Sequence, residues 1–280
     1  SSTLVKCDDI PYVSIDSELY YKKILRYLNS KNNILFYKSK ENVDLNHGIV
    51  FNSLHMPISN SKKCYYQHFY GIEIVTEKGY FNPNQLHLMD FSDTDEGVHF
   101  FYTLPFTKNK ALIETTWISK KTNLRKKDYL DQLTVYIRDK LNISSYNIKF
   151  SEHGCLPLYH QNIKTKNNEV LIGAPANLIR KSTGYAFLNI QNHSKFITNN
   201  IKDILSISNF KLKSKYDIYD EILFRVIEKS PNQMPEIFRS LFTSNTNSVI
   251  KFLSSNSSMM DDFLAVMNLP KKIFLRALIP

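Results

Sequence analysis

The spacing of hydrophobic residues near the start of the chain predicts one helix and two short strands. Over residues 17–29 the apolar side chains recur every three or four positions and share one helix face: Tyr20, Ile24, Tyr27 and Leu28. A polar side chain can cap the start of this helix, and there are three candidates: Ser14, Asp16 and Ser17. The apolar runs at residues 34–37 and 49–51 are short and predict strands.

The stretch over residues 65–119 has a different pattern, which is typical of strands. Four runs rich in aromatic and β-branched residues follow one another: residues 67–76, 85–91, 98–104 and 111–118. Short polar breaks separate the runs, as at residues 93–97. Because neighbouring strands with such short connections pair in opposite directions, we expect an antiparallel sheet.

An amphipathic helix is predicted next, around residues 129–141. Strands at residues 148–150 and 170–172 then enclose a loop that contains Gly154 and Pro157.

From Thr183 onward the pattern predicts helices, about five in number, separated by prolines and by Ser/Asn clusters. The elements together indicate an α/β protein, with an α+β arrangement in the residues given.

Composition excludes several classes of protein. The 280 residues are 42% hydrophobic, which fits a folded protein rather than a disordered one. Cys7, Cys64 and Cys155 are scattered and form no CxxC pair, so we expect neither a disulfide framework nor a zinc site, and a reducing cytoplasm fits. No apolar run approaches the ~20 residues that span a bilayer, and no signal peptide opens the chain. We therefore expect a soluble or peripheral protein.

The net charge of +10 favours anionic partners, either nucleic acid or a membrane surface. No nucleic-acid-binding motif is present, and the aromatic residues follow strand and helix patterns typical of a core. We therefore expect no nucleic-acid partner. A generic basic surface is the alternative to membrane binding.

Common catalytic and phosphate-binding motifs are missing from the sequence. The eight histidines are dispersed without HxxxH or HExxH spacing, so no metal site is predicted. No GxSxG elbow is present, which leaves an α/β-hydrolase triad without support. No two of the seven glycines are separated by a single residue, so the sequence contains neither a GxGxxG motif nor a P-loop.

Two segments carry chemical information. In the apolar run at residues 111–116 the carboxylate of Glu114 would be partly desolvated, which raises its pKa and suits it to proton transfer. The alternative is an ordinary outward-facing strand residue. In the second segment a strand leads to Gly173 and small residues, then to a predicted helix start at Thr183. Small residues let a flat ligand approach the backbone; the alternative is a tight connection without a ligand.

Short motifs occur in a characteristic order over nearly the whole chain. They are Pro11-Tyr12-Val13-Ser14-Ile15, Gln67-His68-Phe69-Tyr70-Gly71, Leu88-Met89-Asp90-Phe91, Tyr102-x-x-Pro105-Phe106, Glu114-Thr115-Thr116, Glu152-His153-Gly154-x-x-Pro157, Gly173, residues 182–187, Phe252-Leu253-Ser254 and Leu269-Pro270. One such tripeptide means little, whereas this many in one order are specific. Through these motifs and their order, the chain resembles the lycopene cyclase family of flavoproteins.

The resemblance implies a fold, in which a nucleotide-binding α/β domain joins an antiparallel sheet that covers the substrate. Four parts follow from it: residues 1–60 as the remainder of the FAD-binding domain, 61–160 as the β substrate domain with one helix, 161–205 as the returning FAD-binding segment and 206–280 as a helical region. The N-terminal Rossmann unit of that flavoprotein fold is not among these residues.

The resemblance also implies a cofactor and a reaction. The cofactor is FAD in its reduced form, with NAD(P)H as a candidate electron source. The substrate is lycopene or a related acyclic carotenoid, taken from the cytoplasmic membrane by a cytoplasmic protein peripheral to it. A proton adds to an end double bond, a six-membered ring closes and a proton leaves, with no net redox change and with β-type rings expected.

Candidate residues follow from the same resemblance. Glu114 occupies the acidic position of the family's Glu-x-Thr motif and is the first acid/base candidate, and Asp90 is the second. The residues that match the flavin-contacting segment are Gly173, Ala174, Pro175, Ala176, Thr183, Gly184 and Tyr185. In two places the chain departs from the pattern, because Ala174 replaces an acidic residue and residues 51–54 lack the charges of an Asp-x-Arg-like turn. Since the glycine-rich unit is also missing from these residues, the chain as given is expected to hold FAD poorly or not at all.

Other functions stay open on the sequence. One is a different isoprenoid-acting flavoprotein, such as a reductase or monooxygenase, and another is an inactive, truncated relative that binds an apolar ligand or a membrane. The run at residues 269–279 combines cations with bulky apolar groups, as interfacial helices do. A terminal helix that packs on the core is the alternative reading of that run.

Overall fold

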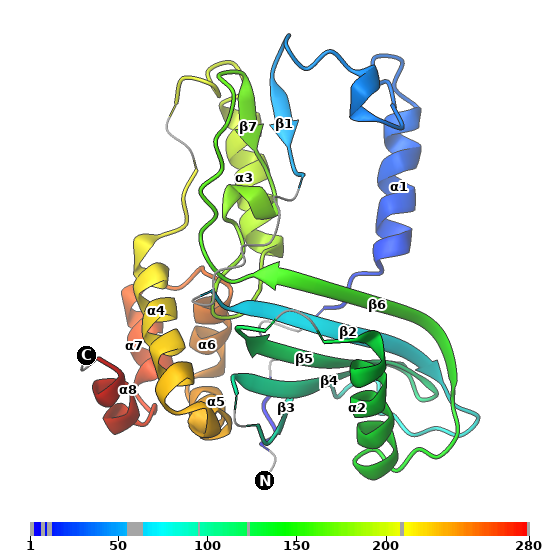
Figure 1. Cartoon of the computed structure of the whole chain (residues 1–280), viewed down its shortest axis with the longest axis vertical. Coiled ribbons are helices and arrows are strands. Elements are labelled where there is room, and N and C mark those ends of the chain that lie inside the picture. The colour runs from blue at the N-terminus through cyan, green and yellow to red at the C-terminus, as the bar shows by residue number, and fades with distance from the viewer. Residues whose placement is uncertain are drawn as a thin grey trace.

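A computed structural model describes residues 3–6, 9, 13–54, 64–94, 96–121, 124–207 and 210–278 (Figure 1). Cys7 and the Pro11-Tyr12 part of the first motif lie outside the described residues. The strands are β1 (Val50–Asn52), β2 (Tyr66–Val75), β3 (His87–Ser92), β4 (Val98–Thr107), β5 (Lys110–Ser119), β6 (Asn147–Pro157) and β7 (Glu169–Leu171). The α-helices are α1 (Ser17–Asn29), α2 (Lys126–Asp139), α3 (Phe187–Asn199), α4 (Ser214–Lys229), α5 (Met234–Phe242), α6 (Thr246–Leu253), α7 (Met259–Val266) and α8 (Lys271–Leu278). Short 3₁₀ helices are η1 (Lys40–Asn42), η2 (Ala174–Ala176) and η3 (Pro231–Gln233).

The larger of the two sheets, which we call the central sheet, has five antiparallel strands in the order β3-β4-β5-β2-β6. A tight turn joins β5 to β4, and β5 pairs on its other side with β2, the first strand of this sheet in the chain. The predicted antiparallel sheet is therefore confirmed, with its four expected strands shifted by a few residues at most of their ends. Strand β6 adds a fifth strand beside β2.

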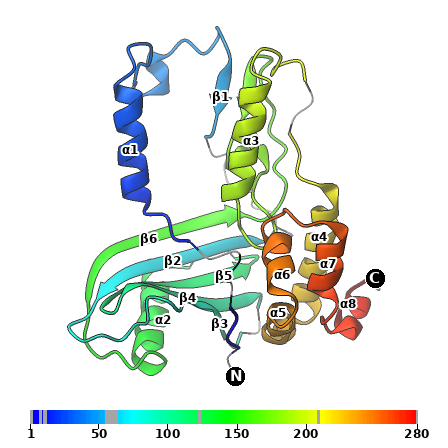
Figure 2. The same ribbon diagram turned by 180° about the vertical axis from the view of Figure 1, so that it is seen from behind.

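Helix α2 covers one face of this sheet. The helix buries residues at the spacing of an amphipathic helix: Tyr129, Leu133, Tyr136 and Ile137. They join strand residues in one apolar cluster, in which Tyr136 stacks on Phe101 with ring centroids 4.1 Å apart. Figure 2 shows the sheet from behind, with α2 on its far side.

Helices α4 to α8 pack against the end of the sheet where β4 begins and β5 ends (Figure 1). Val98 and Ile118 from these strands share a core with helix residues that include Val226, Val249 and Ala277. The predicted helical C-terminal part of an α/β protein is thus confirmed. None of the described helices is long and apolar enough to cross a membrane.

A smaller unit contains β1 and β7, which pair in parallel, with α3 beside them (Figures 1 and 2). The predicted helix over residues 17–29 is confirmed as α1, and its cap is Asp16, which accepts a hydrogen bond from the Leu19 amide at 2.9 Å. No residue of α1 is buried.

Three predictions about secondary structure were wrong. Residues 34–37 form no strand, because Leu35, Phe36 and Tyr37 are exposed and no strand among the described residues pairs with them to complete their backbone hydrogen bonds. Gly154 and Pro157 lie within β6 rather than in a loop, because pairing with β2 continues to Tyr66; β6 is an edge strand, which tolerates proline. Thr183 lies in a turn, and the helix after it begins at Phe187.

Candidate active site

The two faces of the central sheet differ in what covers them. Side chains alternate along β5, so Ile113 and Thr115 face α2, whereas Glu114 and Thr116 face the other way. The α2 face is filled with buried residues, but many side chains of the other face stay half-buried within the described structure. We call this second face, which carries Gln67, Glu114 and their cross-strand neighbours, the carboxylate face.

Four strands form a row of residues across the carboxylate face. Glu114 of β5 pairs with Tyr102 of β4 on one side and with Gly71 of β2 on the other. Gly71 in turn pairs with Glu152 of β6. Because paired strands lie about 5 Å apart, a single glycine separates two carboxylates on one face.

The space above Gly71 is filled from both neighbouring strands. A Cβ atom at Gly71 would lie 3.2 Å from Cγ and 3.4 Å from Oε1 of Glu152. It would also lie 3.3 Å from a methyl carbon of Leu112 on β5. The Glu152 side chain therefore leans over Gly71, toward the strand that carries Glu114.

Burial changes the protonation of both carboxyl groups. Burial is the main reason that the pKa of Glu114 is raised to about 7, and the nearby charge of Glu152 raises it as well. The Thr116 hydroxyl donates a hydrogen bond to Glu114 at 2.6 Å, which lowers the pKa and offsets part of this rise. Burial also raises the pKa of Glu152. At neutral pH a substantial share of Glu114 is therefore protonated, which is the state that a proton donor needs.

Asp90, the second acid predicted from sequence, lies on the other face of the sheet. It pairs with Phe101, and its carboxylate accepts a hydrogen bond from the Tyr136 hydroxyl of α2 at 2.9 Å. The structure therefore does not bring Asp90 and Glu114 together. Its contact with α2 gives Asp90 a clear structural partner.

The segment predicted to contact flavin follows β7. Gly173 has a φ of 66°, and nothing lies within 4 Å of a Cβ added there, so the backbone at Gly173 is open to a ligand. Ala174, Pro175 and Ala176 form η2 directly after it, with Pro175 buried. These four residues thus form one open turn at the end of a strand.

The second part of that segment contacts the carboxylate face. Gly184 has a φ of 66°, and a Cβ added there would lie 2.1 Å from Oε1 of Gln67 on β2. Gln67 is four residues from Gly71 on the same strand and the same face, about 13 Å along it. Thr183 and Tyr185 flank Gly184, and the Thr183 hydroxyl accepts a hydrogen bond from the Tyr185 amide at 3.2 Å. The structure therefore brings this turn to the edge of the face that carries Glu114.

A buried ion pair holds the turn at residues 180–185 in place. The Arg180 guanidinium donates to Asp220 of α4 at 2.7 Å and to the Phe252 carbonyl of α6 at 2.9 Å. Its backbone amide also donates to the Tyr185 carbonyl at 2.8 Å. The C-terminal helices therefore fix the turn that touches the carboxylate face.

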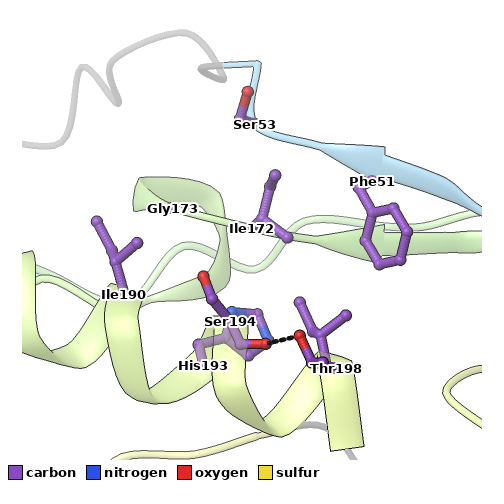
Figure 3. A pocket seen from close by; sticks show the side chains of 9 residues that line it. Phe51, Ser53, Ile172, Gly173, Ile190, His193, Ser194 and Thr198 are labelled. Carbon is purple, nitrogen blue, oxygen red and sulfur yellow. Dashed lines mark hydrogen bonds between the residues drawn. The ribbon is translucent and has the colours of Figure 1, made fainter. Parts of the chain in front are cut away.

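A cavity of about 360 Å³ lies beside Gly173, between β1, β7 and α3 (Figure 3). Its lining is mainly apolar, with Phe51 from β1 and Ile190 from α3 (Figure 3). His193 also lines it, and burial lowers the pKa of this histidine, which favours the neutral ring. The open side of Gly173 thus continues into an apolar hollow.

Sequence reasoning missed the partnership of Glu152 with Glu114. Glu152 was noted only as part of a motif, and Gly71 only as the end of another. A glycine inside an otherwise bulky strand is a signal for a close approach, and Gly71 was available as that signal.

The chain has detectable relatives among characterised proteins. Over 132 residues it is 28% identical to the chloroplastic lycopene beta cyclases of Nicotiana tabacum and Solanum lycopersicum. Each match covers 43% of this chain and 26% of the relative, so the matched part is about a quarter of those proteins.

Solved structures give more distant matches. A geranylgeranyl bacteriochlorophyll reductase-like protein of Thermoplasma acidophilum matches with a TM-score of 0.42 and 14% identity, over 77% of this chain and 55% of that one. A flavin-dependent halogenase of Brevundimonas sp. BAL3 matches with a TM-score of 0.30 and 11% identity, over 75% and 36%. These likenesses are too low to support an argument about function.

The comparison with protein families covers almost the whole chain. The family model described as lycopene cyclase protein matches residues 29–278, which include the central sheet, the turn after β7 and the C-terminal helices. The chain therefore belongs to the lycopene cyclase family.

Proposed function

We propose that this protein closes the ends of lycopene, or of a related acyclic carotenoid, into ionone rings of β type. The observation that carries the proposal is Glu114, a carboxyl group with a pKa near 7 on the half-buried face of the sheet. An acid that stays partly neutral at physiological pH can protonate a carbon–carbon double bond, whereas an ordinary surface carboxylate is ionised. Family membership adds a carotenoid as the class of substrate.

The reaction would begin with transfer of the Glu114 proton to the end double bond. Thr116 accompanies this step, because its hydroxyl donates to Glu114 and stabilises the carboxylate left behind. The aromatic rings of Phe69 and Tyr102 lie on the same face, on the strands to either side of β5. The π faces of these rings can stabilise the cation that forms. Phe69 carries no nucleophile that could trap the cation, and Tyr102 carries only a phenol.

Reduced FAD fits the turn after β7 in part. The residues that would hold it are Gly173 to Ala176 and Thr183 to Tyr185. Gly173 leaves its backbone open to a ligand, whereas the space at Gly184 is taken by the Gln67 side chain. When bound there, reduced flavin would supply an electron-rich ring near the positive charge. NAD(P)H is the proposed electron source.

The substrate is dissolved in lipid, so the protein would act at the cytoplasmic membrane surface, peripheral to it. The net charge of +10 supports attraction to anionic headgroups. On α7 the side chains of Met259, Met260 and Phe263 are more than 60% exposed and present apolar surface. Helix α8 packs on the core through Ile273 and Ala277, so only part of it is free to contact lipid.

The test is to express the complete gene in bacteria that accumulate lycopene and to separate the pigments chromatographically. We expect cyclic carotenoid from the wild type and none from Glu114→Gln. The matched control is Glu73→Gln, since Glu73 lies on the same face two residues from Gly71 but forms an ion pair with Lys110. Unchanged lycopene from a folded, flavin-loaded wild type would refute the proposal and favour a reductase, a monooxygenase or a binding protein.

A further inference from the structure

We propose that Glu152 is the second catalytic carboxylate of this site and that it accepts the proton which leaves the ring cation. The inference rests on the proposed cyclisation and assigns its last step. It follows from the position of Glu152, directly across Gly71 from Glu114 on the carboxylate face.

The two carboxyl groups are close enough to serve one end of a substrate. Glu114 and Glu152 lie two strands apart, which places their Cα atoms about 10 Å from each other. The Glu152 side chain reaches over Gly71, 3.2 Å from where a Cβ would stand, and so shortens the gap between the carboxyl groups. The Leu112 and Glu152 side chains fill the space directly over Gly71, so a six-membered ring would lie on top of them, within reach of both carboxyl groups.

The surroundings of the two groups suit them to opposite roles. Glu114 accepts a hydrogen bond from Thr116, whereas Glu152 has no hydrogen-bond or ion-pair partner among the residues that the structure describes. An unpartnered carboxylate keeps all its lone pairs for a substrate proton. The other charged groups of this part of the face are Glu73 and Lys110, which neutralise one another in an ion pair at 2.9 Å.

Protonation preferences agree with this assignment. Burial raises the pKa of both carboxyl groups, and the charge of Glu152 raises that of Glu114 further, so the two groups titrate as a coupled pair. When Glu114 holds the proton and Glu152 is ionised, the pair provides an acid and a base on the same face.

The proton balance of the reaction is complete with these two groups. The Glu114 O–H bond breaks, and its proton forms a C–H bond at the end double bond. The neighbouring double bond attacks the resulting cation and closes the ring, which leaves a positive carbon within it. Glu152 then removes a proton from an adjacent carbon, and the C–H electron pair becomes the ring double bond. Exchange of both carboxyl groups with water removes this proton from Glu152 and restores one to Glu114. No oxidant or reductant is consumed.

The position of the base has a consequence for the product. A ring cation can lose a proton from more than one neighbouring carbon, and each loss places the double bond differently. A base held on one side of Gly71 would select one of these protons. Glu152 would therefore determine ring type as well as rate.

The test compares Glu152→Gln with the wild type and with Glu73→Gln, each as the complete, flavin-loaded protein supplied with lycopene in lipid vesicles. We expect cyclisation by Glu152→Gln to fall about 10²- to 10⁴-fold, the usual contribution of a general base. We also expect the remaining product to contain rings with a displaced double bond or a hydroxyl group from water. Glu152→Asp should restore part of the rate, and Glu73→Gln should form the wild-type ring.

The outcomes separate this inference from the proposed function. If the wild type forms no ring, the proposed function fails and this inference fails with it. If the wild type forms rings and Glu152→Gln forms the same ring at a similar rate, Glu152 is not the base, although the cyclase function stands. If Glu152→Gln does not fold, Glu152→Asp decides, because an unchanged rate and product ratio with a shortened side chain would overturn the assignment.

Discussion

The unusual pKa of Glu114 predicts that this residue lowers the stability of the folded protein at neutral pH. A rise from 4.5 to about 7 means that the folded protein prefers the neutral carboxyl group. At about 1.4 kcal/mol for each tenfold change in the ionisation constant, the upper limit of this preference is roughly 3 kcal/mol. Because the side chain is only half-buried, solvent screening reduces the expected effect to roughly 1–2 kcal/mol.

The direction of the pH dependence follows from the linkage between protonation and folding. Below pH 4.5 Glu114 is neutral in both states and costs nothing, and as the pH rises toward 7 only the unfolded chain ionises freely. The contribution of Glu114 to the free energy of unfolding therefore falls over this window. Glu114→Gln cannot ionise, so its advantage over the wild type should grow from near zero at pH 4.5 to roughly 1–2 kcal/mol at pH 8.

The assay is urea unfolding of the complete protein and of its Glu114→Gln variant at a series of pH values. Titrating groups that do not interact with Glu114 behave alike in both proteins, so their contributions cancel in the difference. Glu73→Gln serves as the control, because it removes an ion pair and should gain no stability as the pH rises. A difference between Glu114→Gln and wild type that stays flat from pH 4.5 to 8 would refute the account of a neutral Glu114.

Three further predictions concern the framework around the site. Burial lowers the pKa of both His68 and His99 to about 4, so the unfolded chain takes up protons first as the pH falls from 6.5. In Glu114→Gln, which lacks the opposing titration of Glu114, urea unfolding should show stability lost between pH 6.5 and 4. Asp220→Ala should cost about 3–5 kcal/mol in the free energy of unfolding, because it leaves the buried Arg180 guanidinium unpaired, and a wild-type midpoint in urea would contradict this. Gly97→Ala should lower the melting temperature by several degrees, because Gly97 has a φ of 72° and the added Cβ would lie 2.3 Å from a carbonyl oxygen of β5. Calorimetry measures this shift, and an unchanged melting temperature would be inconsistent with the clash.

Much of the sheet could be predicted from sequence because its strands carry a strong local pattern. Aromatic and β-branched runs with short polar breaks specify neighbouring antiparallel strands, and Glu114 stood out because it is charged within such a run. The start of α1 was also local information, since Asp16 caps the helix within one turn.

Which residues meet at the site could not be predicted from local sequence, because it depends on how distant strands pair. Glu152 lies 38 positions after Glu114, and only the register of β2 with both β5 and β6 reveals that they share a row. A difference of one position decides which face a strand residue occupies, and for this reason Asp90, the second acid/base candidate, faces α2 rather than the side of the sheet that carries Glu114. The start of α3 was misplaced because Arg180 pairs with Asp220, far along the chain, and this pair holds the preceding residues in a turn.

The most direct test of the central claim, that Glu114 protonates the substrate, is cyclisation in heavy water. The complete protein with reduced flavin would be supplied with lycopene in vesicles prepared in D₂O, and mass spectrometry would count the deuterium atoms in each ring. Because the Glu114 carboxyl proton exchanges with solvent, we predict one deuterium for every ring formed by the wild type and no rings from Glu114→Gln. Rings without deuterium, or rings formed as well by Glu114→Gln, would contradict the account.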